Sequence, residues 1–340
     1  GRVAGVAPVT TLAPWQQRVL DGALASLAEG RLGHALLFAG AAHMGKLAVA
    51  ERLASRLLCS TPGPDGLACG RCRGCQLMAA GTHPDFKLVS FIPNDKGDKL
   101  RSEIIVDQMR ELGHWFSLTP QMGGAQVALV TPAHALNINA ANALLKTLEE
   151  PSRDRYLLLV TDHPGRLPAT IRSRCQRLDF RPPARAEGEA WLRAQGHDGA
   201  PLAAALDAAR GHPGVAAAWL EEGGMPLRAE VQGELNALAT GRQTPVALAQ
   251  RWLADGQGEL RLRFAAELVL DGMARQLGAA GPAGLTLPPE IQKLAAWFDG
   301  INRAREQLAV PVLRHDLALA ALLLEWRSMF RDKAMQGARR

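Results

Sequence analysis

The sequence has no long hydrophobic run. Nowhere in its 340 residues do about eighteen apolar residues follow one another, the length needed to cross a bilayer. Residues 1–8 are too short for the apolar part of a secretory signal, and glycine and proline interrupt them. We therefore expect a cytoplasmic protein without a membrane partner.

The sequence also lacks a strong charge excess and the composition of a disordered chain. Hydrophobic residues make up 47% and charged residues 21%, as in an ordinary soluble protein with more than one domain. The net charge of +6 favours acidic partners such as nucleic acid, but over this length it is too small to decide. Direct DNA contact stays open at this point.

Cysteine is scarce and unevenly placed. Four of the five cysteines, Cys59, Cys69, Cys72 and Cys75, have the spacing C-x9-C-x2-C-x2-C. In a reducing compartment such cysteines are thiols or metal ligands rather than disulfides. Four thiolates gathered by glycine and proline turns suit tetrahedral Zn²⁺ and leave no open position for catalysis. We predict a structural zinc; the alternative is unrelated or artefactually oxidised thiols, and Cys175 is expected to be a separate buried thiol.

Strand-like and helical segments alternate in the first half of the chain. Short apolar runs occupy 35–39, 126–130, 156–160 and 178–180. Segments with helical periodicity lie between them, which indicates a parallel sheet covered on both faces.

The pattern changes after Pro183, where alanine- and leucine-rich helical segments follow one another without a convincing strand. We predict three parts. These are an α/β domain over 1–181 with the cysteine module at 59–75, a small helical lid over 182–224, and an all-helical domain over 225–340.

A glycine-rich loop follows the first apolar run and precedes a helical segment. Its residues 40–47 nearly match a phosphate-binding loop, with Gly40, Gly45 and Lys46 in place. Leu47 stands where such loops carry Ser or Thr, whose hydroxyl holds Mg²⁺.

The acidic metal ligands of an active ATP site are also missing. At the end of the second apolar run, where they are expected, the chain has Thr131 and Pro132. Together with Leu47 these replacements leave the metal without protein anchors, so we do not expect hydrolysis. Weak binding of nucleotide or phosphate by Lys46 and the helix N-terminus stays open.

A Ser-Arg-Cys sequence at 173–175 precedes the last apolar run. A basic residue in a turn is usually solvated surface, and Arg177 and Arg181 lie close by. Composition alone therefore gives Arg174 no specific role.

Five sequence stretches are informative when they are considered together. They are His-Ala-Leu-Leu-Phe at 34–38, the cysteine segment at 69–78, Gly-Thr-His-Pro-Asp at 81–85, Ala-Asn-Ala-Leu-Leu-Lys-Thr-Leu-Glu-Glu-Pro at 141–151, and Ser-Arg-Cys at 173–175. In these stretches, over about residues 12 to 183, the chain resembles the clamp-loader subunits of bacterial DNA polymerase III. The resemblance implies an AAA+ fold of the P-loop NTPase type, followed by a helical lid and a helical collar domain.

Within that family the residues resemble the delta-prime type. The motor subunits, gamma and tau, keep Gly-Lys-Ser or Gly-Lys-Thr and an acidic pair, whereas this chain has Leu47, Thr131 and Pro132. The resemblance implies a non-hydrolysing stator whose Arg174 reaches the ATP of a neighbouring subunit in trans. It also implies gamma or tau and delta as partners, and the beta sliding clamp and primer-template DNA through the complex.

Two alternatives remain. One is a gamma-type ATPase that uses unusual metal anchors, and the other is a zinc-dependent DNA-binding module. A basic end with Arg327, Arg331, Lys333, Arg339 and Arg340 would suit the latter, although a solvated tail explains it equally well.

Overall fold

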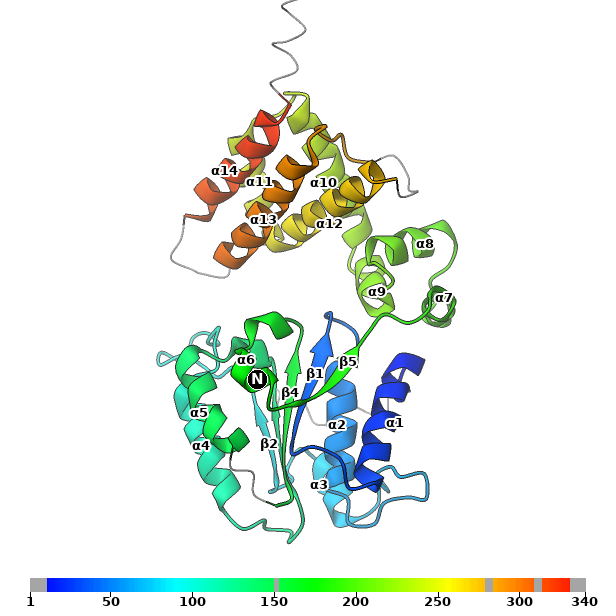
Figure 1. The fold of residues 1–340 in the computed structure, drawn as a ribbon, viewed down its shortest axis with the longest axis vertical. Coiled ribbons are helices and arrows are strands. Elements are labelled where there is room, and N and C mark those ends of the chain that lie inside the picture. Colours follow the sequence, from blue (N-terminus) through cyan, green and yellow to red (C-terminus); the bar gives the residue numbers. More distant parts are fainter. Residues whose placement is uncertain (1–10, 150–152, 279–283, 309–313, 331–340) are drawn as a thin grey trace, which may run out of the picture. The chain divides into compact units, whose positions relative to one another are not determined.

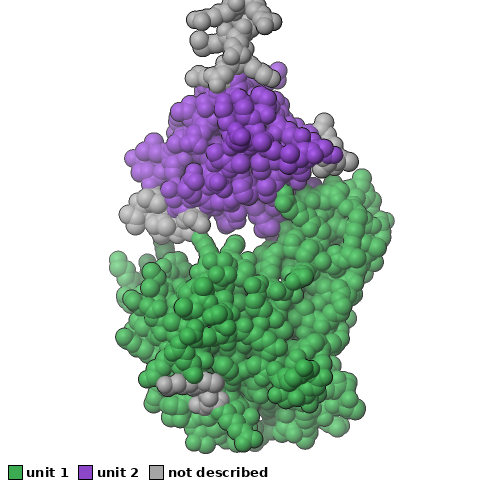
Figure 2. Space-filling model, in the orientation of Figure 1, with its two compact units in different colours: residues 1–218 green, residues 219–340 purple. Residues whose placement is uncertain are grey.

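The computed structural model describes residues 11–149, 153–278, 284–308 and 314–330. It divides the chain into two compact units, 1–218 and 219–340 (Figure 2). The basic residues at 331–340, the start of the chain at 1–8, and Glu150 and Pro151 of the long motif lie outside the described residues.

A five-stranded parallel sheet forms the centre of the first unit. In sequence order the strands are β1 (Ala35–Gly40), β2 (Phe86–Val89), β3 (Gln126–Val130), β4 (Arg155–Thr161) and β5 (Gln176–Phe180). In space their order is β2-β3-β4-β1-β5. The predicted parallel sheet is confirmed, and β2 is a strand that the apolar pattern did not reveal.

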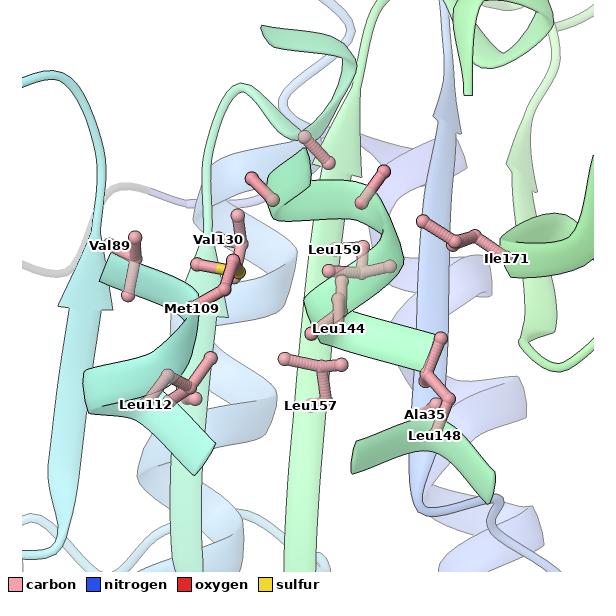
Figure 3. Packing of buried hydrophobic residues seen from close by; sticks show 14 of the residues in the cluster. Ala35, Val89, Met109, Leu112, Val130, Leu144, Leu148, Leu157, Leu159 and Ile171 are labelled. Carbon is pink, nitrogen blue, oxygen red and sulfur yellow. The ribbon is translucent and has the colours of Figure 1, made fainter. Parts of the chain in front are cut away.

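Helices cover both faces of this sheet (Figure 1). The side chains of β1 alternate: Leu37 packs with α4 (Val106–Ser117) and α5 (Ile138–Glu149), whereas Phe38 packs on the other face. Figure 3 shows the first of these layers, in which Leu144 of α5 lies close to Leu157 and Leu159 of β4 and Leu112 of α4 lies further along the sheet. The other layer is built on α1 (Pro14–Ala28) and α2 (Lys46–Leu57).

Three further helices follow β5 in the first part of the chain. They are α7 (Arg185–Ala194), α8 (Gly199–Ala208) and α9 (Pro213–Glu221), and α9 contains the boundary between the two units. Helix α7 docks on α1: Arg18 forms two hydrogen bonds of 2.8 and 2.9 Å with Glu187, and the rings of Trp15 and Trp191 lie 5.2 Å apart. The two short remaining helices are α3 (Arg73–Ala79) and α6 (Ala169–Arg172).

The described residues of the second unit are helical. The helices are α10 (Gly224–Ala239), α11 (Pro245–Ala254), α12 (Gly258–Gln276), α13 (Ile291–Leu308) and α14 (His315–Ser328). The predicted helical second half is thus confirmed. Among the described helices of the chain, none has the length and apolar character of a membrane span.

Three buried tryptophans, one each in α11, α13 and α14, help to hold this helical unit together, and the indole N–H of each of the three has an acceptor. Trp297 donates to the carbonyl oxygen of Leu322 at 2.7 Å, and Trp326 donates to that of Leu235 at 3.0 Å. Trp252 donates at 2.5 Å to the carboxylate of Glu234, a buried acid that Arg251 also contacts. Because an unpaired buried donor is costly, Glu234 links α10 to α11.

Replacing Glu234 with Ala should lower the free energy of unfolding by about 2 to 4 kcal/mol, because the Trp252 N–H loses its acceptor and a cavity remains. Glu234→Gln keeps an acceptor oxygen and should cost clearly less. Urea unfolding followed by tryptophan fluorescence measures both. Equal stability of Glu234→Ala and the unaltered chain would contradict this role.

Candidate functional site

The four clustered cysteines converge in space. Their Sγ atoms all lie within 4.8 Å of one another. Cys59 follows the end of α2, Cys72 caps the N-terminus of α3, and Cys75 lies in its first turn. The structure thus brings together the residues that the spacing predicted, although it also places a short helix in a segment that showed no periodicity.

Backbone N–H groups point at these sulfur atoms. Cys69 donates to the sulfur of Cys59 and Cys72 to that of Cys69, both at 3.3 Å. Cys75 donates to the sulfur of Cys72 at 3.4 Å. Each such bond favours the thiolate, the form that binds metal.

The thiol pKa values differ strongly within the cluster. A hydrogen bond from Thr61, helped by backbone N–H groups, lowers the pKa of Cys69 to about 7. Burial opposes ionisation of Cys72, but hydrogen bonds from the Cys75 N–H and from Ser60 outweigh it and lower its pKa to about 5. Burial and the neighbouring sulfurs raise the pKa of Cys75 to about 12. Four crowded sulfurs cannot all be thiolates without a cation among them, and the cluster could hold a metal ion in this role.

The glycine-rich loop has the backbone of a phosphate-binding loop. Gly40 ends β1 in register with Phe180 of β5, and Gly45 starts α2 in the left-handed region at φ 78°. Only glycine adopts that conformation readily. A Cβ atom on Gly45 would also lie 2.1 Å from the side-chain nitrogen Nε2 of Gln16. Trp15 and Gln16 also donate to the carbonyl oxygen of Met44, both at 3.3 Å, so α1 fixes the loop.

Lys46 is turned inward and paired within its own chain. Its residue is 4% exposed, and its Nζ lies 2.6 Å from the carboxylate of Asp162, which follows β4. It also donates to the carbonyl oxygen of Ala41. The ammonium that would contact phosphate in a functional loop is therefore already neutralised by a carboxylate. Sequence reasoning missed Asp162; its place directly after a buried strand was the available signal.

The first turn of α9 lies against the other side of the loop. A Cβ atom on Gly214 would lie 1.8 Å from the carbonyl oxygen of His43, so glycine is required for this approach. Leu47, at the position of the missing hydroxyl, is 40% exposed. The loop is thus covered by α1 and by α9.

Two histidines, His134 and His163, lie near the positions after β3 where acidic metal ligands would be expected. Thr131 and Pro132 directly follow β3 and lead to His134, whose Nδ1 lies 3.1 Å from the hydroxyl of Thr161. The rings of His134 and His163 meet edge to face, with centroids 4.8 Å apart. Burial, with the nearby His163, lowers the pKa of His134 to about 4. A neutral imidazole here supplies no negative oxygen for Mg²⁺.

Arg174 lies elsewhere, just after α6 and before β5. Residue Gln176 of β5 pairs with Leu36 near the start of β1, whereas the glycine-rich loop follows the end of β1. Arg174 is therefore toward the end of the sheet opposite Lys46. Its guanidinium Nη2 lies 2.7 Å from the carboxylate of Glu149, and its side chain is 37% exposed.

Cys175 is separate from the cysteine cluster, as predicted, but it is half-buried rather than buried. It packs against the sheet layer formed with α4 and α5, and burial raises the pKa of its thiol to about 11. It therefore stays a neutral thiol at neutral pH.

Comparisons with known proteins agree on one family. A family profile described as "DNA polymerase III, delta subunit" matches residues 15–184. The DNA polymerase III subunit delta' of Escherichia coli is 34% identical over 325 residues, which span 92% of this chain and 94% of that protein. The subunit delta' of Pseudomonas aeruginosa is 46% identical over 181 residues, 53% of this chain and about half (52%) of that protein.

The similarity to a motor subunit is more limited. DNA polymerase III subunit tau of Escherichia coli is 36% identical over 160 residues, which span 47% of this chain and 23% of that protein. The match to the Escherichia coli delta' protein, in contrast, continues through both units.

The buried His134 makes stability depend on pH. The unfolded chain takes up a proton near pH 6.5, but the folded chain does so only near pH 4, so stability falls as the pH drops between these values. Between pH 7 and 4.5 this contribution should be about 1 kcal/mol, after allowance for partial solvent exposure of the ring. In His134→Gln, the free energy of unfolding measured with urea should decline by about that much less between pH 7 and 4.5. The same decline in the variant would contradict this assignment.

Proposed function

The chain belongs to the delta-prime subunit family of bacterial DNA polymerase III, and we propose that it is a clamp-loader stator that controls ATP hydrolysis without performing it. One observation carries the proposal. The Lys46–Asp162 ion pair occupies the glycine-rich loop, while the Ser-Arg-Cys sequence around Arg174 is complete.

The residues around the loop support the absence of hydrolysis. Mg²⁺ would find no hydroxyl at Leu47 and no carboxylate at Thr131 or Pro132. Phosphate would have to displace Asp162 from a buried lysine. We propose that nucleotide is not held productively at Gly40, Gly45 and Lys46.

Arg174 gives the chain its influence on chemistry. In the proposed assembly its guanidinium reaches ATP bound to a neighbouring subunit and stabilises negative charge on the phosphoryl group being transferred. A planar, permanently charged side chain with several N–H donors suits phosphate oxygens. An arginine supplied in trans is typically worth three to five orders of magnitude in rate at the site it enters.

The proposed partners follow from the family. They are gamma or tau and delta subunits, with the beta clamp and primed DNA engaged through the complex in the cytoplasm. We assign the AAA+ domain to 1–181, the lid to 182–224 and the collar that joins the ring to 225–340. No membrane partner is proposed.

The cysteine cluster is proposed to hold a structural Zn²⁺. Cys59, Cys69, Cys72 and Cys75 would supply all four ligands, and thiolates at this spacing prefer zinc among common metals. Such an ion would tie the end of α2 to the start of α3. It would take no part in ATP chemistry.

Protein purified without chelator should contain about one zinc ion per chain, because four thiolates complete its tetrahedral shell. Cys72→Ser should lose the metal and unfold at lower temperature, measured by elemental analysis and calorimetry. Cys175→Ser is the matched control, since Cys175 is a thiol outside the cluster, and it should keep the zinc. A metal-free unaltered chain would refute the site.

Arg174→Ala should leave the complex with gamma and delta subunits intact and lower its DNA- and clamp-stimulated ATPase. The rate of ATP hydrolysis at the site that Arg174 enters is expected to fall on the order of 10³-fold. Total turnover of the complex should therefore fall by the fraction that this site contributes. Arg177→Ala, a nearby exposed arginine paired with Asp179, is the matched control. Steady-state phosphate release measures both.

Unchanged turnover with Arg174→Ala would overturn the proposal. The same assay on the isolated chain tests the gamma-type alternative: turnover that disappears with Lys46→Ala would favour a motor subunit. Turnover that survives this change would indicate a contaminating ATPase. Tight, salt-dependent DNA binding by the isolated chain would favour the DNA-binding alternative.

A further inference from the structure

Arg174 is held by two acceptors of its own chain. Nη2 lies 2.7 Å from Oε1 of Glu149, and Nη1 donates to the carbonyl oxygen of Thr170 at 2.9 Å. A guanidinium carries five N–H donors, so these contacts orient the side chain and leave donors free for a ligand. A long side chain fixed in this way loses less conformational entropy when it binds.

Glu149 is an unfavourable residue for its own helix. It is the last residue of α5, where the helix dipole disfavours negative charge. It is also about half exposed, so it contributes nothing to the apolar core. The opposite charge of Arg174 compensates for the carboxylate at this helix end.

The end of α5 that carries Glu149 is itself anchored. Nε2 of His34, just before β1, lies 3.2 Å from the carbonyl oxygen of Leu148. On the other side of the pair, Cys175 packs into the sheet layer directly after Arg174. Three sequence stretches that stand far apart, at 34–38, 141–151 and 173–175, thus meet at one ion pair.

We propose that Glu149 is a positioning residue for Arg174. It holds the guanidinium at the end of α5 in a conformation ready for a phosphate on a neighbouring subunit, and the anchors at His34 and Cys175 keep that conformation constant. This inference rests on the proposed function of Arg174 in trans.

The test uses the reconstituted complex with gamma and delta subunits. Glu149→Gln preserves shape and removes the charge. It should lower the rate at the adjoining ATP site about two- to fivefold, the range expected for a partly exposed ion pair, and so lower kcat of the complex by less than Arg174→Ala does, with KM for ATP unchanged. Glu149→Asp retains a carboxylate and should recover part of the loss.

A double-mutant cycle separates positioning from general stability. Once Arg174 is alanine, Glu149→Gln should have no additional effect on turnover. Asp179→Asn removes the carboxylate beside Arg177 and serves as the matched control, with unchanged kcat expected.

The inference is overturned if Glu149→Gln leaves kcat unchanged, raises it, adds its loss to that of Arg174→Ala, or prevents assembly of the complex. An increase would identify Glu149 as a brake on Arg174. If Arg174→Ala itself has no effect, the proposed function fails. If Arg174→Ala lowers turnover and Glu149→Gln does not, only the positioning role fails.

Discussion

The ion pair between Lys46 and Asp162 is the constraint on which the arrangement of the first unit depends. An unpaired ammonium with so little exposure would be strongly destabilising, since burial of a charge is tolerated only with a partner. In a phosphate-binding loop the ligand provides that partner. Here a carboxylate that follows β4 provides it.

With Lys46 paired inside the chain, two helices pack directly against the loop. Helix α1 holds the carbonyl oxygen of Met44, and α9 approaches His43 through Gly214. Such close covering by side chains and backbone leaves the loop with structural contacts on both sides. The loop therefore connects the sheet with α1 and α9 through direct contacts.

The sheet could be predicted from sequence because β1, β3 and β4 are apolar on both faces. The edge strand β2 could not, since Lys87 interrupts it and Val89 is its one fully buried residue. The cysteine cluster could be predicted because its ligands are close in sequence. The acidic partners of Lys46 and Arg174 could not be predicted. Asp162 and Glu149 are acids in ordinary sequence surroundings, and their roles depend on contacts between segments that are distant in the sequence.

Both ion pairs join a basic residue of a motif to an acid from another element, yet they differ in exposure. Lys46 is buried, so its exchange of Asp162 for another anion would require uncovering and resolvation of the charge. Arg174 is partly exposed, and an exposed pair is worth little, so a phosphate can compete for its donors at small cost. The same kind of contact thus disfavours anion binding at one end of the sheet and, under the proposed function, leaves the other end open to a phosphate. Burial, rather than the identity of the charged residues, separates the pair at Lys46 from the pair at Arg174, for which we propose the action on a neighbour.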